Sequence, residues 1–178
     1  MNIVIVGISG FLGSRLKSFF QKKRYKVFDY KKKLPTKIDI IINVAGPDNK
    51  FCSENVKRGI SERLKINNQI LKIVKKNKIK KYFYISSIHV YKNQILINEK
   101  SPLNYKNAYG YSHLLSEKFI LEKFKNICEI KILRLSNCFG YCENLNSSSW
   151  DLVINDIVKN IFIKNKILIK SATNFKKD

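Results

Sequence analysis

Three glycines near the start of the chain are spaced for holding a phosphate group. Gly7, Gly10 and Gly13 lie in the segment Gly-Ile-Ser-Gly-Phe-Leu-Gly, between an apolar run and a helical pattern. Gly7 permits a tight turn, Gly10 lets the backbone approach a pyrophosphate, and Gly13 lets helix and strand pack closely. The free N–H groups at the positive end of the helix would meet the phosphates. We predict a dinucleotide site at Gly7, Gly10, Phe11, Leu12 and Gly13, with an ordinary glycine-containing turn as the alternative.

Asp29 ends the next apolar run and bears on which dinucleotide would bind. A carboxylate at this position can hold the ribose hydroxyls of the adenosine, and it would repel a 2′-phosphate. Lys31, Lys32 and Lys33 follow closely and could instead take up such a phosphate. A solvent-facing aspartate at a strand end is a further interpretation. We therefore predict NAD as the cofactor, and NADP is not excluded.

Short apolar runs alternate with helical periodicity along the chain, which predicts a parallel sheet covered on both faces. This is the doubly wound α/β arrangement of the NAD(P)-binding Rossmann fold. Strands are predicted at residues 2–6, 25–28, 38–44, 81–85 and 129–133, with a further short strand at 167–169. Helices are predicted at residues 11–22, 61–76, 108–124 and 150–161. Ligands of such folds bind at the carboxyl edge of the sheet, so candidate site residues should follow the strands.

The glycine spacing and four later segments resemble the extended short-chain dehydrogenase/reductase superfamily, and within it the NAD-dependent epimerase/dehydratase family. The segments are Asn43-Val44-Ala45-Gly46, Tyr84-Ile85-Ser86-Ser87-Ile88-His89-Val90-Tyr91, the stretch from Pro102 to Glu117 with Tyr109-Gly110-Tyr111-Ser112-His113, and Leu133-Arg134-Leu135-Ser136-Asn137-Cys138-Phe139-Gly140. They follow the family's order along nearly the whole chain. The resemblance implies that Ala45 and Gly46 lie along the cofactor and that Ser87, His89 and Asn137 contact the substrate. For His89, a partly buried structural histidine is an equal alternative.

Tyr109 is the acid/base that this resemblance implies. Hydride transfer at a sugar carbon requires a group that removes or supplies a hydroxyl proton. A tyrosine can do both when its pKa is lowered from about 10 toward neutrality. Ser87 would form a hydrogen bond at the same substrate oxygen and orient the substrate. The structural alternatives are a capping serine for Ser87 and an ordinary aromatic residue near a helix start for Tyr109.

His113 stands where the family usually has lysine, four residues after Tyr109 and on the same helix face. In the family that lysine holds the nicotinamide ribose and lowers the tyrosine pKa through its charge. Histidine can still hydrogen-bond ribose hydroxyls, but with an unperturbed pKa of about 6.5 it is mostly neutral at pH 7. We therefore expect His113 to contact the cofactor and to give Tyr109 weaker electrostatic help than lysine would.

The end of the chain bears on how much of a family enzyme is present. Family members carry a smaller substrate-binding lobe after the cofactor domain, and residues 174–178 resemble the opening of a further family segment. We expect residues 1–145 to form the dinucleotide-binding domain and residues 146–178 to form only the beginning of the substrate-binding lobe.

The resemblance implies an NAD(P)-dependent enzyme that acts on nucleotide sugars by hydride transfer at a sugar carbon. Epimerisation, dehydration and reduction all begin from the same residues, and surface-polysaccharide synthesis is the implied pathway. A non-catalytic dinucleotide-binding regulator or remnant is the alternative, and it is favoured by His113 and by the incomplete lobe.

Composition limits the partners of the chain. Its 178 residues carry a formal net charge of +22 from 35 basic and 13 acidic residues. Almost all of the basic residues are lysines, which are weaker than arginine for bidentate reading of bases, so no specific nucleic acid is expected. A homodimer is expected from the resemblance, through the helices from Ser61 to Lys76 and from Ala108 to Phe124.

Cysteine spacing and hydropathy indicate whether the chain is expected to bind a metal, span a membrane or carry a signal peptide. The four cysteines form no CxxC pair and have no histidine at zinc-site spacing, so no metal site is predicted. No apolar run approaches the roughly eighteen residues that a membrane span requires. The start of the chain lacks a basic leader, so we expect no signal peptide and a cytoplasmic protein.

Overall fold

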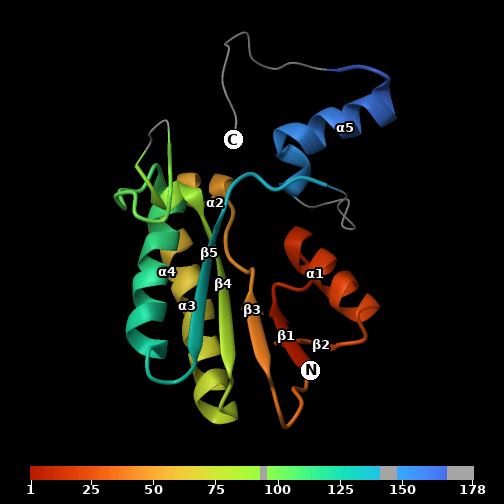
Figure 1. Ribbon diagram of the computed structural model, residues 1–178. Coiled ribbons are helices and arrows are strands. Elements are labelled where there is room, and N and C mark those ends of the chain that lie inside the picture. Colours follow the sequence, from red (N-terminus) through yellow and green to blue (C-terminus); the bar gives the residue numbers. More distant parts are fainter. Residues whose placement is uncertain (93–95, 141–147, 168–178) are drawn as a thin grey trace. The chain divides into compact units, whose positions relative to one another are not determined.

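The computed structural model describes residues 1–92, 96–140 and 148–167. Its sheet has five strands in the order β2-β1-β3-β4-β5, and every neighbouring pair is parallel (Figure 1). The strands are β1 (Asn2–Val6), β2 (Lys26–Asp29), β3 (Ile40–Asn43), β4 (Lys81–Ser87) and β5 (Glu129–Leu135). The helices are α1 (Phe11–Lys22), α2 (Asn49–Glu54), α3 (Val56–Asn77), α4 (Ala108–Phe124) and α5 (Val153–Lys164), with short 3-10 helices η1 (Ile88–Val90) and η2 (Ser148–Asp151).

The chain divides into two compact units, Met1–Leu135 and Ser136–Asp178. The first unit contains the whole sheet and α1 to α4, and the second contains η2 and α5. The domain boundary predicted at residue 145 lies outside the described residues. Within the described part of the chain, no helix is both long and apolar enough to cross a membrane.

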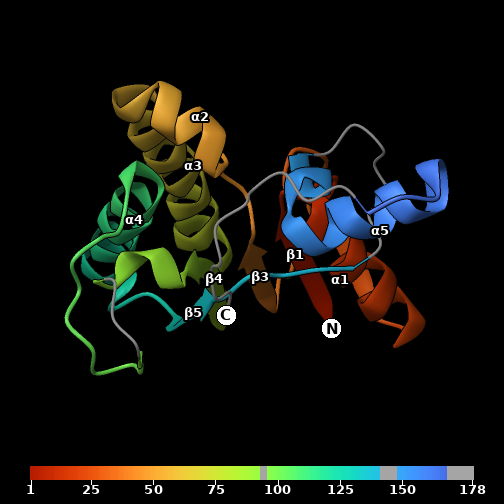
Figure 2. The same ribbon diagram turned by 90° about the horizontal axis from the view of Figure 1, so that it is seen from above.

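Helices cover both faces of the sheet in the first unit. Seen from above, α3 and α4 lie on one side of the sheet and α1 lies on the other (Figure 2). The strand residues alternate between these faces, as pleated strands must. One core cluster contains Val4, Val6, Ile41, Tyr82 and Tyr84 with Ile70, Val74, Ile120 and Phe124 of α3 and α4. The other contains Ile3, Ile5 and Ile42 with Leu16 and Phe20 packed against them from α1. The predicted doubly wound α/β fold is confirmed.

Most predicted elements are present with small differences in their bounds. The helices predicted at residues 11–22 and 108–124 and the strand at 2–6 have those bounds in α1, α4 and β1. β2 lies one residue later than predicted, β3 is shorter than the predicted 38–44, and β4 and β5 each continue two residues further. The helix predicted at 150–161 is divided into η2 and α5. The strand predicted at 167–169 falls mainly on residues outside the described part.

The helical region after β3 begins earlier than the predicted start at Ser61. The additional helix α2 is capped by Asp48, whose Oδ1 accepts a hydrogen bond from the Phe51 N–H at 2.9 Å. Gly59 lets α3 pack directly on α2, because a Cβ there would lie 2.9 Å from Cys52 Sγ. The first turns of α3 are mostly exposed and polar, so they lack the apolar periodicity from which a helix start is predicted.

The connection from β2 to β3 contains no helix or strand. Residues 30–39 run back from the carboxyl edge of the sheet to its amino edge, and β1 lies between the two strands that they join. The end of the connection is tied to β1, because the Asn2 N–H donates to Asp39 Oδ2 at 2.9 Å and Asn2 Nδ2 donates to the Lys37 carbonyl at 2.7 Å. The connection is therefore a loop whose end is anchored to the first strand.

A buried carboxylate links α4 to β4 and β5. Glu117 is 2% exposed and accepts a hydrogen bond from Ser86 Oγ at 2.5 Å. Arg134 pairs with it in a bidentate manner, with Nε 3.0 Å from Oε1 and Nη2 2.7 Å from Oε2. The Nη1 of the same arginine donates to the Tyr91 hydroxyl at 2.7 Å, and these contacts raise the pKa of Arg134 above its usual value. The network holds α4, which carries Tyr109, in a fixed position against the sheet.

Replacing Arg134 with methionine should lower the free energy of unfolding by about 3 kcal/mol, because the buried Glu117 carboxylate would lose its charged partner. Urea unfolding followed by circular dichroism measures this change. The matched control is Lys123→Met, which removes the exposed pair between Lys123 and Glu122 and should cost less than about 1 kcal/mol. Equal losses in the two variants would contradict the role assigned to this network.

Candidate functional site

The glycine segment forms a tight turn from β1 into α1. Gly7 has φ +88°, a left-handed conformation that glycine adopts without strain, and its carbonyl accepts the Gly10 N–H at 3.0 Å. A Cβ on Gly13 would lie 2.0 Å from the Gly7 carbonyl oxygen, so only glycine allows this contact between helix and strand. Gly10 precedes the first helical residue and has no capping side chain. The first-turn N–H groups of α1 are therefore not covered by a side-chain cap and can donate hydrogen bonds to an anion.

The segment after β3 lies directly beside the glycine turn. A Cβ on Gly7 would come within 3.1 Å of the Ala45 backbone, so Gly7 and Ala45 are in contact. Asn43 holds this segment: its Oδ1 accepts the Ala45 N–H at 3.0 Å, and its Nδ2 donates to Asn67 Oδ1 at 3.2 Å and to the Tyr82 hydroxyl at 3.0 Å. β1 and β3 are the strands at which the sheet order reverses, which is where ligands bind in open α/β sheets.

Asp29 lies at the carboxyl end of β2, opposite Ile5 of β1. Its Oδ1 accepts the Lys31 N–H at 3.0 Å, which turns the chain out of the strand. The carboxylate is thus at the same edge of the sheet as the glycine turn. The predicted ribose contact of Asp29 stays a prediction.

Tyr109 is brought to the end of β4 by a close contact between backbones. A Cβ on Gly110 would lie 2.0 Å from the His89 carbonyl oxygen, so the start of α4 packs directly on η1. Asn107 caps α4 by accepting the Gly110 N–H at 2.8 Å. As a result, the ring of Tyr109 lies edge-on to two histidine rings, with centroid distances of 5.7 Å to His89 and 4.6 Å to His113.

Ser87 ends β4 and is nearly buried, at 8% exposed. Its Oγ accepts the His89 N–H at 3.2 Å, which is the capping role considered from the sequence. An oxygen that accepts this bond can still donate its own proton to a ligand. The structure therefore puts Ser87, His89 and Tyr109 in one cluster at the carboxyl edge, while their contacts with a substrate stay predictions.

His113 is buried beneath Tyr109. It is 3% exposed, and its Nδ1 lies 2.9 Å from the Tyr84 hydroxyl in a hydrogen bond. Within the described part of the chain its Nε2 has no hydrogen-bond partner. Desolvation, with smaller contributions from Arg63 and His89, holds the pKa of His113 well below its usual value. The ring is therefore neutral at pH 7, and the predicted contact of His113 with the cofactor stays a prediction.

Arg63 is a site residue that the sequence analysis did not identify. Its side chain is 3% exposed and lies between α3, α4 and the segment after β3. Nε donates to Ser112 Oγ at 3.0 Å, Nη2 donates to the Pro47 carbonyl at 2.6 Å, and Cζ lies 5.4 Å from the centroid of the Tyr109 ring. A Cβ on Gly46 would lie 2.2 Å from Nη1, so this glycine leaves room for the guanidinium. Arg63 lies in the buried stripe of α3, which consists of Gly59, Arg63, Asn67, Ile70 and Val74. This stripe is known only from the structure.

Asn137 belongs to the second unit and is exposed. In that unit, the Asn155 side chain accepts the Gly140 N–H at 2.9 Å and donates to the Ser149 carbonyl at 2.9 Å, which joins the segment after β5 to η2 and α5. The predicted substrate contact of Asn137 stays a prediction. No group of three or more residues able to hold a metal ion was found in the described part of the chain.

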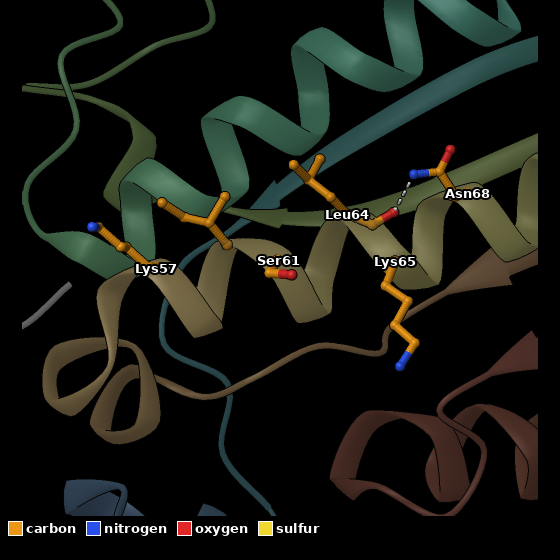
Figure 3. A pocket seen from close by; sticks show the side chains of 6 residues that line it. Lys57, Ser61, Leu64, Lys65 and Asn68 are labelled. Atoms are coloured by element: carbon orange, nitrogen blue, oxygen red, sulfur yellow. Dashed lines mark hydrogen bonds between the residues drawn. The ribbon is translucent and has the colours of Figure 1, made fainter.

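A shallow depression of about 570 Å³ lies along α3 and does not belong to this cluster (Figure 3). Six residues of that helix line it: Lys57, Ile60, Ser61, Leu64, Lys65 and Asn68. None of them is a predicted catalytic or cofactor-binding residue. The depression lies on one of the two helices through which a homodimer is predicted, and the homodimer stays a prediction.

The sheet order, the glycine turn at the reversal point and the helices on both faces define a Rossmann-type fold. Residues 29–176 match the NAD dependent epimerase/dehydratase family. The chain belongs to this family, which confirms the resemblance found in the sequence. A comparison with curated proteins found no match.

Solved structures with a similar fold include nucleotide-sugar enzymes. UDP-glucuronic acid 4-epimerase from Bacillus cereus, in complex with UDP-glucuronic acid and NAD, has a TM-score of 0.71 and 19% identity, over 91% of this chain and 63% of that one. The NAD-dependent NDP-hexosamine 5,6-dehydratase TunA of tunicamycin biosynthesis has a TM-score of 0.77 and 15% identity, over 96% of this chain and 64% of that one. RMD from Pseudomonas aeruginosa, complexed with NADPH, has a TM-score of 0.77 and 19% identity, over 90% of this chain and 60% of that one. The chain thus spans 60–64% of the length of these proteins.

Burial of a neutral His113 predicts a specific dependence of stability on pH. The unfolded chain binds a proton at this histidine below about pH 6.5, whereas the folded chain does not until a much lower pH. Its contribution to stability is therefore present above that pH and is lost as the pH falls, by about 1.4 kcal/mol per unit until the folded pKa is reached.

Urea unfolding at pH 7.5 and pH 5.5 should therefore show a larger loss of stability in the wild type than in His113→Gln, by about 1 kcal/mol. Other titrating groups contribute equally to both proteins and cancel in the difference. The same comparison with His89→Gln serves as the control for a histidine in contact with the same tyrosine ring. Identical pH dependence in wild type and His113→Gln would show that His113 is accessible to protons in the folded chain.

Proposed function

We propose that the chain binds NAD(P) and acts on a nucleotide sugar by hydride transfer at a sugar carbon. The observation that carries the proposal is the glycine turn at the sheet's reversal point, with helix N–H groups uncapped and Ala45 in contact with Gly7. The residues present fit a dinucleotide, because among the described residues a Cβ on Gly10 would meet the Gly7 carbonyl oxygen at 3.3 Å and no other atom within 4 Å beyond its chain neighbours. When bound, the dinucleotide would accept or return the hydride.

In this proposal the protein's own residues move the proton and hold the sugar. Tyr109 removes the proton from a sugar hydroxyl through its phenolic oxygen and later returns it. Ser87 donates a hydrogen bond to the same sugar oxygen and so fixes its position. His113 contributes Nε2 as a neutral partner for a ribose hydroxyl. His89 lies beside the Tyr109 ring and would contact the sugar. The substrate contact of Asn137, which belongs to the second unit, stays a prediction.

NAD is the proposed cofactor, with NADP as the alternative. Asp29 lies at the end of β2 with one oxygen committed to the Lys31 N–H, and its remaining oxygen can accept from ribose hydroxyls. Lys31, Lys32 and Lys33 in the following loop are the residues that would favour a 2′-phosphate. Relatives in the fold comparison hold NAD in one case and NADPH in another.

The outcome of the reaction is proposed only as a class: epimerisation, dehydration or reduction of a nucleotide sugar, in surface-polysaccharide synthesis. A homodimer, a cytoplasmic location and the absence of specific nucleic-acid binding stay predictions. A different function, dinucleotide binding without turnover, is favoured by one observation. The residue in the family's lysine position is a buried, neutral histidine, which gives the tyrosine no charge.

Two glycine variants test dinucleotide binding separately from folding. Gly10→Ala should lower the melting temperature less than Gly13→Ala does, because its Cβ would lie 3.3 Å from the Gly7 carbonyl oxygen. It should weaken NAD binding about tenfold or more, because the new methyl group occupies the side from which the pyrophosphate approaches. Gly13→Ala should lower the melting temperature more, because its Cβ would lie 2.0 Å from the Gly7 carbonyl oxygen. Isothermal titration calorimetry with NAD and with NADP measures both binding and cofactor preference. Unchanged NAD binding by Gly10→Ala would place any dinucleotide site elsewhere.

Turnover by Tyr109→Phe distinguishes the two functions. Loss of the acid/base should reduce turnover of UDP- or dTDP-hexoses about a hundredfold or more, while NAD binding is retained. The control is Tyr111→Phe, since Tyr111 lies on the same helix and packs on Tyr105 instead, at a centroid distance of 4.5 Å. If the wild type binds NAD, Tyr109→Phe binds it equally well and neither turns over a sugar nucleotide, the non-catalytic function is favoured for these 178 residues.

A further inference from the structure

Arg63 is a buried cation with no acidic partner in the described part of the chain. None of the four ion pairs found there includes it. Its polar partners are uncharged: Nε donates to Ser112 Oγ, Nη2 donates to the Pro47 carbonyl, and the guanidinium also contacts the Tyr84 hydroxyl. Burying an arginine without a carboxylate costs free energy that contacts with neutral groups only partly offset. We therefore expect the Arg63 charge to have a role other than packing.

The guanidinium is directed at Tyr109. Its Cζ lies 5.4 Å from the centroid of that ring, and it is anchored on the other side by the Pro47 carbonyl at 2.6 Å. Ser112, which accepts from Arg63 Nε, in turn donates to the Tyr109 carbonyl at 2.8 Å. The arginine and the tyrosine are therefore coupled twice, once through the ring and once through Ser112.

The positive charge of Arg63 reaches the titrating groups around Tyr109. Burial raises the pKa of Tyr84, and Arg63 is the largest of the effects that oppose this rise. The same charge adds to the lowering of the pKa of His113, where desolvation is the main cause. Both effects have the sign of a cation that favours a phenolate and disfavours an imidazolium.

The groups that face Tyr109 come from four elements. They are Arg63 from α3, Tyr84 from β4, His89 from η1 and His113 from its own helix α4. Of these four, Arg63 alone carries a permanent charge at neutral pH. The two histidines are in ring contact with Tyr109, and His113 is held neutral by burial.

We propose that Arg63 is a positioning residue that stabilises the anionic form of Tyr109, and that it supplies from α3 the charge that His113 does not supply from α4. This inference rests on the proposed role of Tyr109 as the acid/base. The phenolate of Tyr109 is the form that accepts the proton of the sugar hydroxyl. The same phenolate is left when the proton returns to the sugar. A fixed guanidinium beside the ring keeps that form accessible at neutral pH.

The test is a titration of Tyr109 in the 178-residue chain, without cofactor or sugar. Tyrosines labelled with ¹³C at Cζ report phenolate formation by NMR, and the Tyr109→Phe variant assigns the signal. We expect the wild-type pKa of Tyr109 to lie below the usual value of about 10. Arg63→Gln should raise it by about one unit or more, and Arg63→Lys should keep most of the lowering, because it keeps the charge.

Two further variants separate charge from structure. Arg58→Gln is the matched control, because Arg58 lies on the same helix with its guanidinium 5.5 Å from the ring of Phe51, and its removal should leave Tyr109 unchanged. The double variant with Arg63→Gln and His113→Lys should bring the pKa of Tyr109 back toward the wild-type value, because the lysine returns a charge to the same ring. A purely structural role for Arg63 predicts no such rescue.

A wild-type pKa at or above about 10, or equal values in wild type and a folded Arg63→Gln, would overturn the proposal. If Arg63→Gln does not fold, Arg63→Met and the wild-type titration still decide it. The titration is independent of the proposed function, since it needs neither NAD nor a sugar. A lowered pKa together with an absence of turnover would favour the non-catalytic function and leave the electrostatic role of Arg63 standing.

Discussion

Two helices approach the carboxyl edge of the sheet so closely that a hydrogen atom is all that fits between the backbones. At α1 the contact is between Gly13 and the Gly7 carbonyl, and at α4 it is between Gly110 and the His89 carbonyl, where an added Cβ would lie 2.0 Å from the oxygen in each case. The first contact brings helix N–H groups to the end of β1. The second brings Tyr109 to the end of β4. The candidate site exists because both contacts are made at the same edge of one sheet.

The charge at the candidate site is buried, whereas most of the charge of the chain comes from lysines spread along the sequence. The net charge of +22 comes largely from lysines spread along the sequence, and solvent and salt screen exposed charges of this kind. Arg63 is the opposite case, because its buried guanidinium is little screened and acts on a few named groups. The buried pair of Glu117 and Arg134 has another role, since the two charges neutralise each other and join α4 to the sheet.

Much of the fold could be predicted from the sequence, because it depends on local patterns. The bounds of β1, α1 and α4 were predicted correctly, because the glycine segment marks the end of β1 and the start of α1, and Asn107 caps the start of α4. α2 and the start of α3 were missed, because they are held by the contact of Gly59 with Cys52 rather than by an apolar stripe. The cluster of Ser87, Tyr109 and His113 could be named from the family pattern. Arg63 could not, because its importance comes from contacts with residues that are distant in the sequence.

In the loop between β2 and β3, the residues that bear on cofactor preference are not part of a helix that packs on the sheet. Residues 30–39 contain no helix or strand. Tyr30 and Leu34 pack against the core, and the last part of the loop is hydrogen-bonded to β1. Lys31, Lys32 and Lys33, which bear on the proposed preference between NAD and NADP, lie in this loop, and Asp29 immediately precedes it. Substitutions among these lysines change no helix that the core requires. Substitution at these positions can therefore alter the proposed preference between NAD and NADP without changing a helix that packs on the sheet.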